Sequence, residues 1–531
     1  MSIIIQTVQF LTNELIVLLF SVILLTYVWF QYKYTYWSKK GVIGPTPVFP
    51  FGNIRDVIQR KKQFFQPYCD YYFKYKHLPY VGVYSFNQPV LSINDPDIAK
   101  LVMIKDFDYF SSHGMYSGGA ADPLAGHLFN LHGKPWRALR NKMTPAFSPG
   151  KLKAMYPLVD NIANEGLQYA NLVHSNDEVM NFTDFYAKYA MEIVGSVGFG
   201  VECNGFKNPG SEFYLRVTLC KHMFLLKNYY FFNKRIYNYI FFRTVIRSLS
   251  FFMPNFFNKL GISRINPDTI SFFNKLVEET VQYRISKNYE RNDFLQTLIE
   301  LKNGQLINDQ GKYYTLKDFK FSMTDIAANT VLYLFAGYET SATTGQFAAY
   351  ELARNPDIQA RAREEVQRVL AEHGGRCTYE AQNEMVYLNM VIDETMRIHP
   401  PMRALFRKCT KDYKLPNTNL VIEEGTRVFV PIAAIQMDPE IFPKPEVFDP
   451  ERFSPENKVK MHPCHWMPFG EGPRKCLGLR QGYIQTKMAL IKMLQTYELL
   501  MDDRTAVPMR LKASSLACAA EGGIWLKLKK L

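Results

Sequence analysis

Cysteine is scarce in this chain of 531 residues, and the eight that occur are scattered without any pairing rhythm. This distribution argues against a disulfide scaffold and fits a reducing compartment better. Internal repeats and low-complexity tracts are also missing, and charged residues make up 21% against 47% hydrophobic ones. That balance excludes a disordered or collagen-like chain and indicates a globular protein.

Acidic residues are outnumbered, since Lys and Arg total 63, Asp and Glu total 49, and the net charge is +14. Such a charge could attract nucleic acid, anionic lipid or an acidic protein. A nucleic-acid binder would explain the charge but no other feature of the sequence, so we expect no nucleic-acid partner. Residues 213–257 interleave aromatic and basic side chains, which suits an interfacial membrane surface, although buried helices would account for most of the rings.

Charge is almost absent from residues 1–32, where Glu14 is the single charged side chain. As a helix the uncharged run 15–30 spans ~24 Å, slightly less than the ~30 Å hydrocarbon core of a bilayer. A cleaved signal peptide needs cations before its apolar run, whereas here the first cation, Lys33, follows it. We therefore predict an uncleaved anchor with the rest of the chain in the cytosol, and a buried core helix is the alternative. An aromatic belt at the membrane surface is expected from Tyr32, Tyr34, Tyr36 and Trp37.

Proline is concentrated just after this run, at Pro45, Pro47 and Pro50, where it forbids helix and stiffens the chain. The predicted organisation is therefore a membrane anchor over residues 1–32, a basic and Pro-rich connector over residues 33–53, and one catalytic body over residues 54–531.

Helical patterns dominate the body, and the longest of them runs over residues 321–353. Strand-like segments are few and short, at residues 80–84, 90–93, 426–430 and 524–528. The sequence therefore predicts a mainly α fold with small β-sheets. Residues 410–470 are rich in proline and irregular, and a long irregular stretch inside a compact domain is usually functional.

A cysteine lies in a glycine-punctuated loop at residues 469–478, FGEGPRKCLG. Glycine lets the backbone approach a flat ligand closely, and nearby N–H groups can stabilise a thiolate. Such a loop can hold Cys476 against haem iron, whereas a buried structural cysteine is the default interpretation of a lone Cys. A zinc site built with His462, Cys464 and His465 is disfavoured because the spacing fits no common structural zinc pattern.

Three charged residues form a second constellation. Glu394 and Arg397 share a helical face at spacing i, i+3, and the motif Pro450-Glu-Arg452-Phe could bring a second arginine to the same carboxylate. A surface salt bridge is the plain interpretation of such a pair, whereas a buried Arg–Glu–Arg triad would specify geometry.

An acid and an alcohol adjoin in the middle of the long helix, at Glu339 and Thr340 within AGYETS. A threonine hydroxyl there can bond its own i−4 carbonyl or a ligand, and the pair is a plausible proton relay. A mid-helix Thr-Ser pair is otherwise common and uninformative.

Together and in this order, these motifs resemble the cytochrome P450 family of haem-thiolate monooxygenases. The similarity runs from the Pro-rich connector to the last strand and includes WRALR at 136–140, which resembles the family's haem-contacting helix. Residues 407–485 look closest to the insect microsomal group often associated with foreign compounds and insecticides. Two positions depart from the usual pattern, because Gln481 replaces an aromatic residue and Gln436 replaces a histidine.

The resemblance implies a P450 fold with an N-terminal transmembrane helix and a role for each matching residue. Cys476 would be the thiolate ligand of the iron of haem b, in a cofactor-binding loop that also contains Phe469 and Gly478. Glu339 and Thr340 would deliver protons to the oxygen being activated. The haem propionates would be held by Trp136, Arg140, Arg407 and Arg474. The structural triad behind the haem would be Glu394, Arg397 and Arg452.

An apolar substrate pocket is also implied, with walls from Phe129, Leu332, Phe335, Ala336, Met402, Leu405 and Leu516. Arg403 stands in the pocket loop where related insect sequences often carry proline. Because an unpaired charge is costly there, we expect an anionic partner for Arg403. That partner is either a haem propionate or the polar or acidic end of a mainly apolar substrate.

The implied function is the insertion of one oxygen atom from O2 into a small, mainly apolar molecule: a xenobiotic, an insecticide, or an endogenous lipid or hormone. Electrons would come from NADPH through a membrane-bound cytochrome P450 reductase, with cytochrome b5 as a second donor, at the endoplasmic reticulum membrane. A haem-thiolate isomerase or dehydratase and a non-catalytic haem-binding or ligand-carrying membrane protein remain as alternatives. Such isomerases often lack the acid–alcohol pair, so Glu339 and Thr340 favour oxygen activation.

Overall fold

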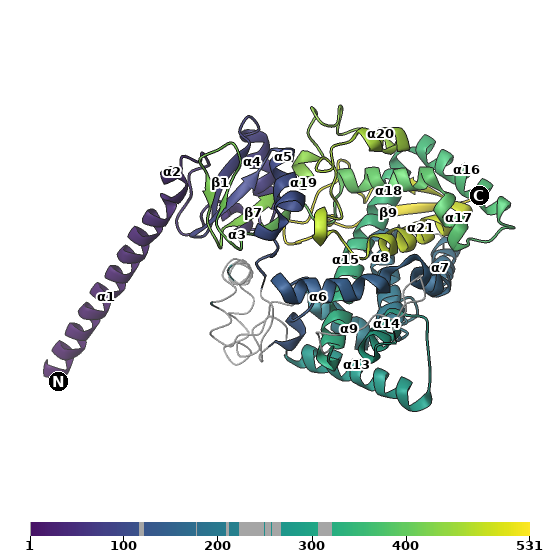
Figure 1. Cartoon of the computed structure of the whole chain (residues 1–531), viewed down its shortest axis with the longest axis horizontal. Helices are drawn as coiled ribbons and strands as arrows, with labels where there is room; N and C mark the ends of the chain where they lie inside the picture. The colour runs from purple at the N-terminus through teal and green to yellow at the C-terminus, as the bar shows by residue number, and fades with distance from the viewer. Residues whose placement is uncertain are drawn as a thin grey trace.

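The computed structural model describes residues 2–115, 122–176, 178–208, 212–221, 267–305 and 321–531, together with Leu249 and Phe256. Most of the aromatic and basic segment 213–257 therefore lies outside the described residues. A four-stranded sheet lies beside a larger helical body, on the side from which the N-terminal helix projects (Figure 1). The predicted mainly α fold with small sheets is confirmed.

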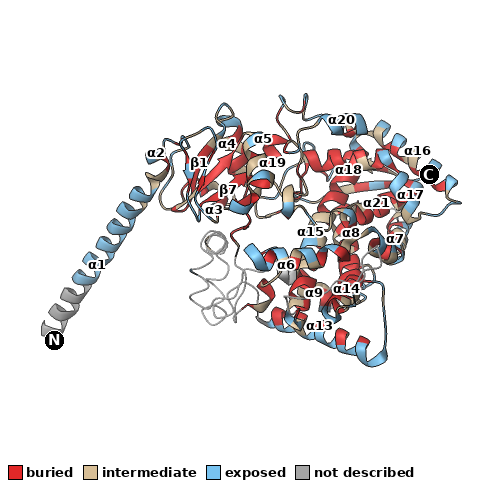
Figure 2. Ribbon diagram, in the orientation of Figure 1, coloured by how far each residue is buried: buried red, intermediate tan, exposed pale blue. Residues whose placement is uncertain are grey.

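The N-terminal helix α1 (Ser2–Tyr34) extends away from the body, and Figure 2 colours as exposed most of those of its residues whose burial is described. Within the described residues, one helical stretch, Asn13–Lys39, is long and apolar enough to cross a membrane, and its most apolar window has no buried residue. An unbroken apolar surface on an isolated helix is costly in water, so the structure is consistent with the predicted membrane anchor.

Aromatic rings join the end of α1 to the sheet, in a group that we call the aromatic clasp: Tyr27, Phe30, Tyr34, Trp37, Phe49 and Tyr84. Phe49 lies with its ring centroid 5.1 Å from that of Phe30, and Tyr34 lies 5.1 Å from Tyr84. The Trp37 ring is 2% exposed and donates its Nε1–H to the Val83 carbonyl at 3.0 Å. The expected place of Trp37 in a lipid-facing aromatic belt is therefore wrong, because the ring packs on the backbone of Gly82, where any Cβ would collide with it.

The four-stranded sheet has the strand order β1-β2-β7-β4 and positions one buried arginine of the site. β2 pairs antiparallel with β1 and parallel with β7, and β4 pairs antiparallel with β7, which sets Arg407 opposite Val428. Its strands are β1 (Tyr80–Ser85), β2 (Gln88–Ile93), β4 (Leu405–Lys408) and β7 (Arg427–Val430). The smaller sheets contain β3 (Met180–Asn181), β8 (Tyr497–Met501) and β9 (Trp525–Lys530), and β5 (Tyr413–Lys414) and β6 (Val421–Ile422). All four predicted strand segments are confirmed within a few residues.

Helices form the rest of the described body. Those of the N-terminal half are α2 (Tyr36–Lys39), α3 (Arg55–Ile58), α4 (Gln66–Lys74), α5 (Pro96–Lys100), α6 (Gly133–Met143), α7 (Pro149–Ser175), α8 (Phe182–Ile193) and α9 (Glu212–Lys221). Those of the C-terminal half are α13 (Pro267–Lys287), α14 (Phe294–Asn303), α15 (Met323–Arg354), α16 (Pro356–Glu372), α17 (Tyr379–Glu384), α18 (Val386–Ile398), α19 (Ile432–Ile435), α20 (Pro455–Lys460) and α21 (Leu479–Thr496).

The long helix α15 runs through the centre of the helical body and is buried along most of its length (Figure 2). It begins with a capping box, in which Ser322 and Asp325 satisfy each other's backbone N–H groups, and it ends before Pro356. Gly345 allows the Tyr186 ring of α8 to pack directly on α15, since a Cβ at this position would collide with that ring. The predicted long helix over residues 321–353 is thus confirmed, with its capped start two residues later.

Candidate cofactor and active site

The cysteine loop lies between the irregular segment after α20 and the start of α21. The Cys476 N–H donates to the Phe469 carbonyl at 2.9 Å, which closes the loop. Gly472 has φ +73°, and any Cβ there would collide with the backbone of Met103. Glycine is therefore required at this position both for the left-handed backbone and for the close approach of the neighbouring chain.

Cys476 differs from the other cysteines in its surroundings. Among the seven described cysteines it alone is exposed, although burial by the surrounding protein raises the pKa of its thiol. A side chain that is accessible and yet crowded by protein faces an interior space rather than the outer surface. The Gly478 N–H and the charge of Arg140 act in the opposite direction and lower this pKa, as expected for groups that stabilise a thiolate.

Three arginines form a cluster beside this loop, and we call Arg140, Arg407 and Arg474 the arginine cluster. Arg407 is 2% exposed, donates only to the neighbouring Phe406 carbonyl at 2.9 Å, and has a buried Nε without a partner. Burial lowers the pKa of Arg407 to about 10. For Arg474, burial and then the charges of Arg407 and Arg140 lower the pKa to about 9.

No carboxylate contacts the arginine cluster within the described part of the chain. Arg140 donates to the Lys475 carbonyl at 2.6 Å, and Arg474 donates to main-chain carbonyls such as that of Ser111 at 3.0 Å. Repulsion among uncompensated buried cations is costly, so the cluster fits a ligand that brings negative charge. Haem b carries two propionate carboxylates, and its iron can take a cysteine thiolate as ligand, so the residues fit this cofactor. The Arg474 guanidinium also lies 4.2 Å from the ring centre of Trp136, on α6.

His113 belongs to the same region and was missed by the sequence interpretation. Its ring stacks on Phe129 at 4.2 Å, and its Nδ1 lies 2.9 Å from the Phe129 carbonyl and 3.4 Å from Arg474. Burial, with the charges of Arg407 and Arg474 next in size, holds the pKa of His113 well below its ordinary value. A lone histidine carries no sequence signal of this position, since its contacts are 16 and 361 residues away.

The middle of α15 presents an accessible stripe on an otherwise buried helix. Ala336 and Glu339 are exposed, and the half-buried residues of the same stripe are Leu332, Phe335 and Thr340. These positions follow the i, i+3, i+4 spacing of a single helical face. The Thr340 hydroxyl donates to the Ala336 carbonyl at 2.5 Å, the i−4 bond expected from the sequence.

The remaining candidate pocket residues come from the sheet side. Phe129 has its ring 6.3 Å from Phe406 on β4, and Leu405, at the start of β4, lies 3.9 Å from where a Cβ on Gly470 would stand. Met402 and Leu516 pack, half-buried, against the apolar cluster that contains Phe406. Whether these residues contact a substrate stays a prediction.

Arg403 finds its contacts on α4 and near the C-terminus. Its Nη2 donates to Gln66 Oε1 at 2.8 Å, whereas its Nε is buried without a partner. Its charge lowers the pKa of the buried thiols of Cys69 and Cys518 against the larger raising effect of their burial. Within the described residues Arg403 has no carboxylate partner, so the expected anionic partner stays a prediction.

The three triad residues lie together. Glu394 and Arg397 are both fully buried and joined by two bonds, Nε to Oε2 at 2.7 Å and Nη2 to Oε1 at 2.8 Å. Arg452 Nε lies 3.4 Å from Glu394 Oε1. Gln436 supports the triad, because it accepts from Arg397 through its carbonyl and donates from Nε2 to two carbonyls at the end of α18. The Nε2 of Gln481, the other departure from the family pattern, is buried without a partner.

Comparison with known proteins agrees with these features. The family model described as Cytochrome P450 matches residues 43–526. The chain is 36% identical over 527 residues to "Cytochrome P450 6k1" of Blattella germanica, covering 97% of each chain. It is 36% identical over 512 residues to "Probable cytochrome P450 6a14" of Drosophila melanogaster, covering 94% of this chain and 96% of the relative. It is also 35% identical over 516 residues to "Cytochrome P450 6a2" of the same fly, covering 96% and 97%. With matches that span nearly its whole length, the chain belongs to the cytochrome P450 family.

Proposed function

We propose that this chain inserts one oxygen atom from O2 into a small, mainly apolar organic substrate, and that foreign compounds are its principal substrate class. The family is one of haem b monooxygenases that receive electrons from NADPH through a reductase. The observation that carries the proposal for this chain is the accessible Cys476, set between an arginine cluster without carboxylates and the accessible stripe of α15. When bound, the haem supplies the oxidative chemistry, and a thiolate ligand favours O–O cleavage.

Two kinds of groups would hold the cofactor. Cys476 would provide the thiolate, whose charge the Gly478 N–H and Arg140 stabilise. Arg407 and Arg474 would receive the two propionates, and the buried Nε of Arg407 offers a donor that no described group uses. Phe469 closes the loop by accepting from the Cys476 N–H, which fixes the direction of the sulfur.

Proton supply falls to Glu339 and Thr340. The Thr340 hydroxyl bonds the Ala336 carbonyl and keeps its lone pairs available to accept from a water or a reacting group. Glu339 is exposed one position earlier on the same stripe and can hand protons to that water. The helix therefore places a proton donor and a relay on one face.

The substrate occupies the space between α15 and the sheet. Leu332, Phe335 and Ala336 give one apolar wall, while Phe129 and Leu405 are proposed for the other. Arg403 would grip a polar or acidic end of the substrate with its unused Nε. A mainly apolar molecule with one polar end thus matches the residues.

The reductase is a partner expected for every member that uses NADPH, and we propose a basic docking face that contains Lys142, Arg137 and Lys475. Two of these cations already have acidic neighbours: Arg137 pairs with Asp108 at 2.7 Å and Lys475 with Glu471 at 2.7 Å. Docking should therefore weaken only moderately with salt. Cytochrome b5 is proposed as a second donor, and membrane lipid as the environment of α1 in the endoplasmic reticulum.

The reduced, CO-bound absorption spectrum of membranes that contain the protein tests the proposal. Wild type and the control Cys464→Ala should show the red-shifted thiolate band, because the Cys464 side chain is fully buried whereas that of Cys476 is accessible. Cys476→Ala should lose this band. Equal spectra from the two variants would contradict the assignment.

Turnover tests the proton relay separately. Thr340→Ala should still bind haem and substrate but divert reducing equivalents to peroxide. Thr344→Ala is the matched control, because its hydroxyl makes the same i−4 bond, at 3.0 Å to the Thr340 carbonyl, from a buried position. Coupling that falls equally in both variants would assign the effect to helix distortion.

A further inference from the structure

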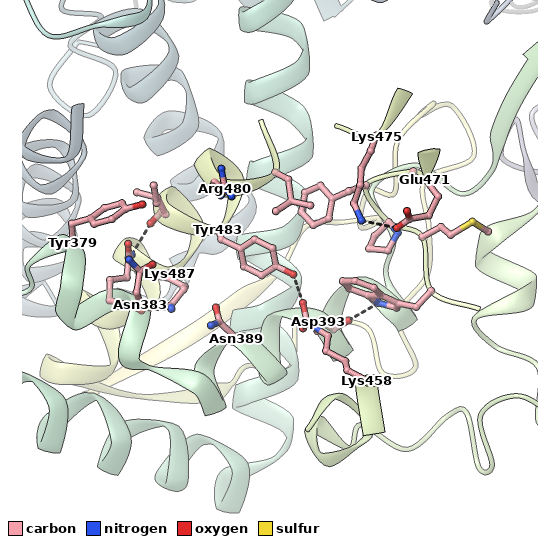
Figure 3. A pocket seen from close by; sticks show the side chains of 18 residues that line it. Tyr379, Asn383, Asn389, Asp393, Lys458, Glu471, Lys475, Arg480, Tyr483 and Lys487 are labelled. Carbon is pink, nitrogen blue, oxygen red and sulfur yellow. Dashed lines mark hydrogen bonds and ion pairs between the residues drawn. The ribbon is translucent and has the colours of Figure 1, made fainter. Parts of the chain in front are cut away.

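A cavity adjoins the cysteine loop and is walled by α17, α18, α21 and residues 466–475 (Figure 3). Its volume is about 550 Å³, which falls within the range of small-molecule sites. None of the residues assigned above to substrate or proton transfer lines it. Figure 3 shows Tyr483 in the middle of the wall, with Tyr379 and Asn383 on one side and Lys475 with Glu471 on the other.

Positive charge along α21 faces this cavity. Arg480, Tyr483 and Lys487 all line it, at spacings of three and seven residues that place them on one helical face. Arg480 is exposed and has no hydrogen bond or ion pair with any described residue. The other two lining cations are neutralised, since Lys475 pairs with Glu471 at 2.7 Å and Lys458 pairs with Asp393 at 2.5 Å.

Lys487 is a buried cation without a carboxylate. It is 3% exposed, and its Nζ donates to the main-chain carbonyls of Gln382 and Met385. Because burial outweighs its acidic neighbours, the pKa of Lys487 falls to about 8. The neighbours that act on it are Glu365, Cys377 and Asp393.

The two carboxylates among these neighbours are already engaged. Glu365 accepts from the N–H groups of Tyr387 and Leu388, both at 2.8 Å, at the start of α18. Asp393 accepts from Lys458 and from the Tyr483 hydroxyl. The cavity therefore keeps two uncompensated positive side chains, Arg480 at the rim and Lys487 in the wall.

The aromatic residues that line the cavity suit a ligand with an aromatic ring. The lining aromatic residues are Tyr379, Trp466, Phe469 and Tyr483, and Phe469 lies with its ring centroid 5.5 Å from that of Tyr483. Gln382 also lines the cavity, and its buried Oε1 accepts no hydrogen bond from any described group. Aromatic surface with two unpaired cations is complementary to a planar body that carries negative charge.

We propose that this cavity is a binding site for a small aromatic anion, a ring bearing a carboxylate or a phosphate, held between Arg480 and Lys487 of α21. The site shares Phe469 and Lys475 with the cysteine loop and contains none of the residues assigned to the substrate space next to α15. One wall contains Lys475, the residue before Cys476, so an occupant would adjoin the cysteine loop.

Three probes test the charge and the ring separately by titration calorimetry on the full-length, haem-loaded protein. Phenyl phosphate carries both features, inorganic phosphate only the charge and benzyl alcohol only the ring. Saturating imidazole blocks the substrate side of the haem in every titration. Phenyl phosphate should bind at least about tenfold more tightly than either partial probe. Affinity equal to that of benzyl alcohol, or no binding at millimolar concentration, would overturn the proposal.

Variants then locate the site. Arg480→Gln and Lys487→Met should each weaken phenyl phosphate binding by about tenfold, the loss expected for one charged hydrogen bond. Lys460→Met removes an exposed cation that does not line the cavity and should have no effect. Arg480 is exposed, so Arg480→Gln should fold and tests the proposal even if Lys487→Met does not fold. Equal affinities in Arg480→Gln and Lys460→Met would overturn the proposal.

Proton linkage in wild type gives an independent readout of Lys487. Above pH 8 its amine is mostly neutral before binding, and a bound phosphate favours the charged form. Phenyl phosphate binding should therefore take up close to one proton at pH 9 and almost none at pH 7. Titrations in buffers of different ionisation enthalpy measure this uptake, and an uptake that is equal at the two pH values would overturn the role of Lys487.

Discussion

Two groups of buried arginines in this molecule have opposite electrostatic surroundings. Arg397 is fully enclosed and meets both oxygens of Glu394, together with the carbonyls of Gln436 at 2.9 Å and Pro445 at 2.7 Å. Arg407 is nearly as buried but has one carbonyl partner and an unused Nε. Arg397 finds its carboxylate within the chain, whereas no carboxylate among the described residues contacts Arg407.

This difference separates what folds the polypeptide from what holds the cofactor. A buried pair whose groups are all satisfied fixes geometry, and removing one partner leaves an uncompensated charge. A buried cation without a carboxylate partner opposes folding, and a ligand can supply that partner. Substitutions in the two groups should therefore fail in different ways.

The largest effect is expected from Glu394→Gln, which leaves Arg397 buried without its carboxylate. Breaking a buried pair costs about 3–5 kcal/mol, so the variant should unfold at markedly lower denaturant concentration and yield little haem protein. Chemical unfolding followed by circular dichroism measures the loss. Glu372→Gln, which breaks the exposed pair with Arg368, is the control and should change stability by less than about 0.5 kcal/mol. Similar losses of unfolding free energy in the two variants would contradict the role assigned to the buried pair.

A smaller and different effect is expected from Arg407→Met. The unfolding midpoint should move far less than in Glu394→Gln, because no carboxylate in the described part of the chain is paired with Arg407. Haem should instead leave about tenfold faster, since a hydrogen bond to a charged group contributes roughly 1.5–3 kcal/mol. Transfer of haem to excess apomyoglobin measures the rate. Arg363→Met, which removes a half-buried arginine on α16 with no contact to the cluster, should release haem at the wild-type rate.

The smallest effect concerns pH and His113, which lies within the arginine cluster. Its folded pKa is lowered, so below about pH 6.5 the unfolded chain binds a proton that the folded protein does not. Stability from this group is therefore full above pH 6.5 and falls by about 1.4 kcal/mol per pH unit below it. His113→Gln should flatten the decline between pH 6.5 and 5.5, and the exposed His77→Gln should not. Parallel declines in all three proteins would contradict this assignment.

Local spacing explains which parts of the site were predictable from the sequence. Glu394 and Arg397 are one helical turn apart, and the glycines that shape the cysteine loop lie within a few residues of Cys476. The family resemblance added Arg452 and Arg407, which are distant in sequence. The long helix, the short strands and the anchor also follow from periodicity and composition.

Contacts between remote segments explain what was missed. His113 contacts Arg474 at a sequence separation of 361 residues, and no pattern near His113 predicts that contact. Trp37 was assigned to a membrane belt by its place after an apolar run, yet a bare Gly82 on β1 provides a surface on which its ring packs. The cavity on α21 depends on which acids are already engaged, and that depends on the tertiary structure.

The aromatic clasp determines where the chain should be truncated to give a soluble enzyme. A truncation placed where hydropathy ends, near Lys39, would delete Trp37 and Tyr34 and strip a packed layer from β1, leaving the Val83 carbonyl without its indole donor. Cutting before Tyr27 would remove most of the apolar helix and retain every ring of the clasp. The useful boundary for expression thus lies inside α1, about one turn before the apolar run ends.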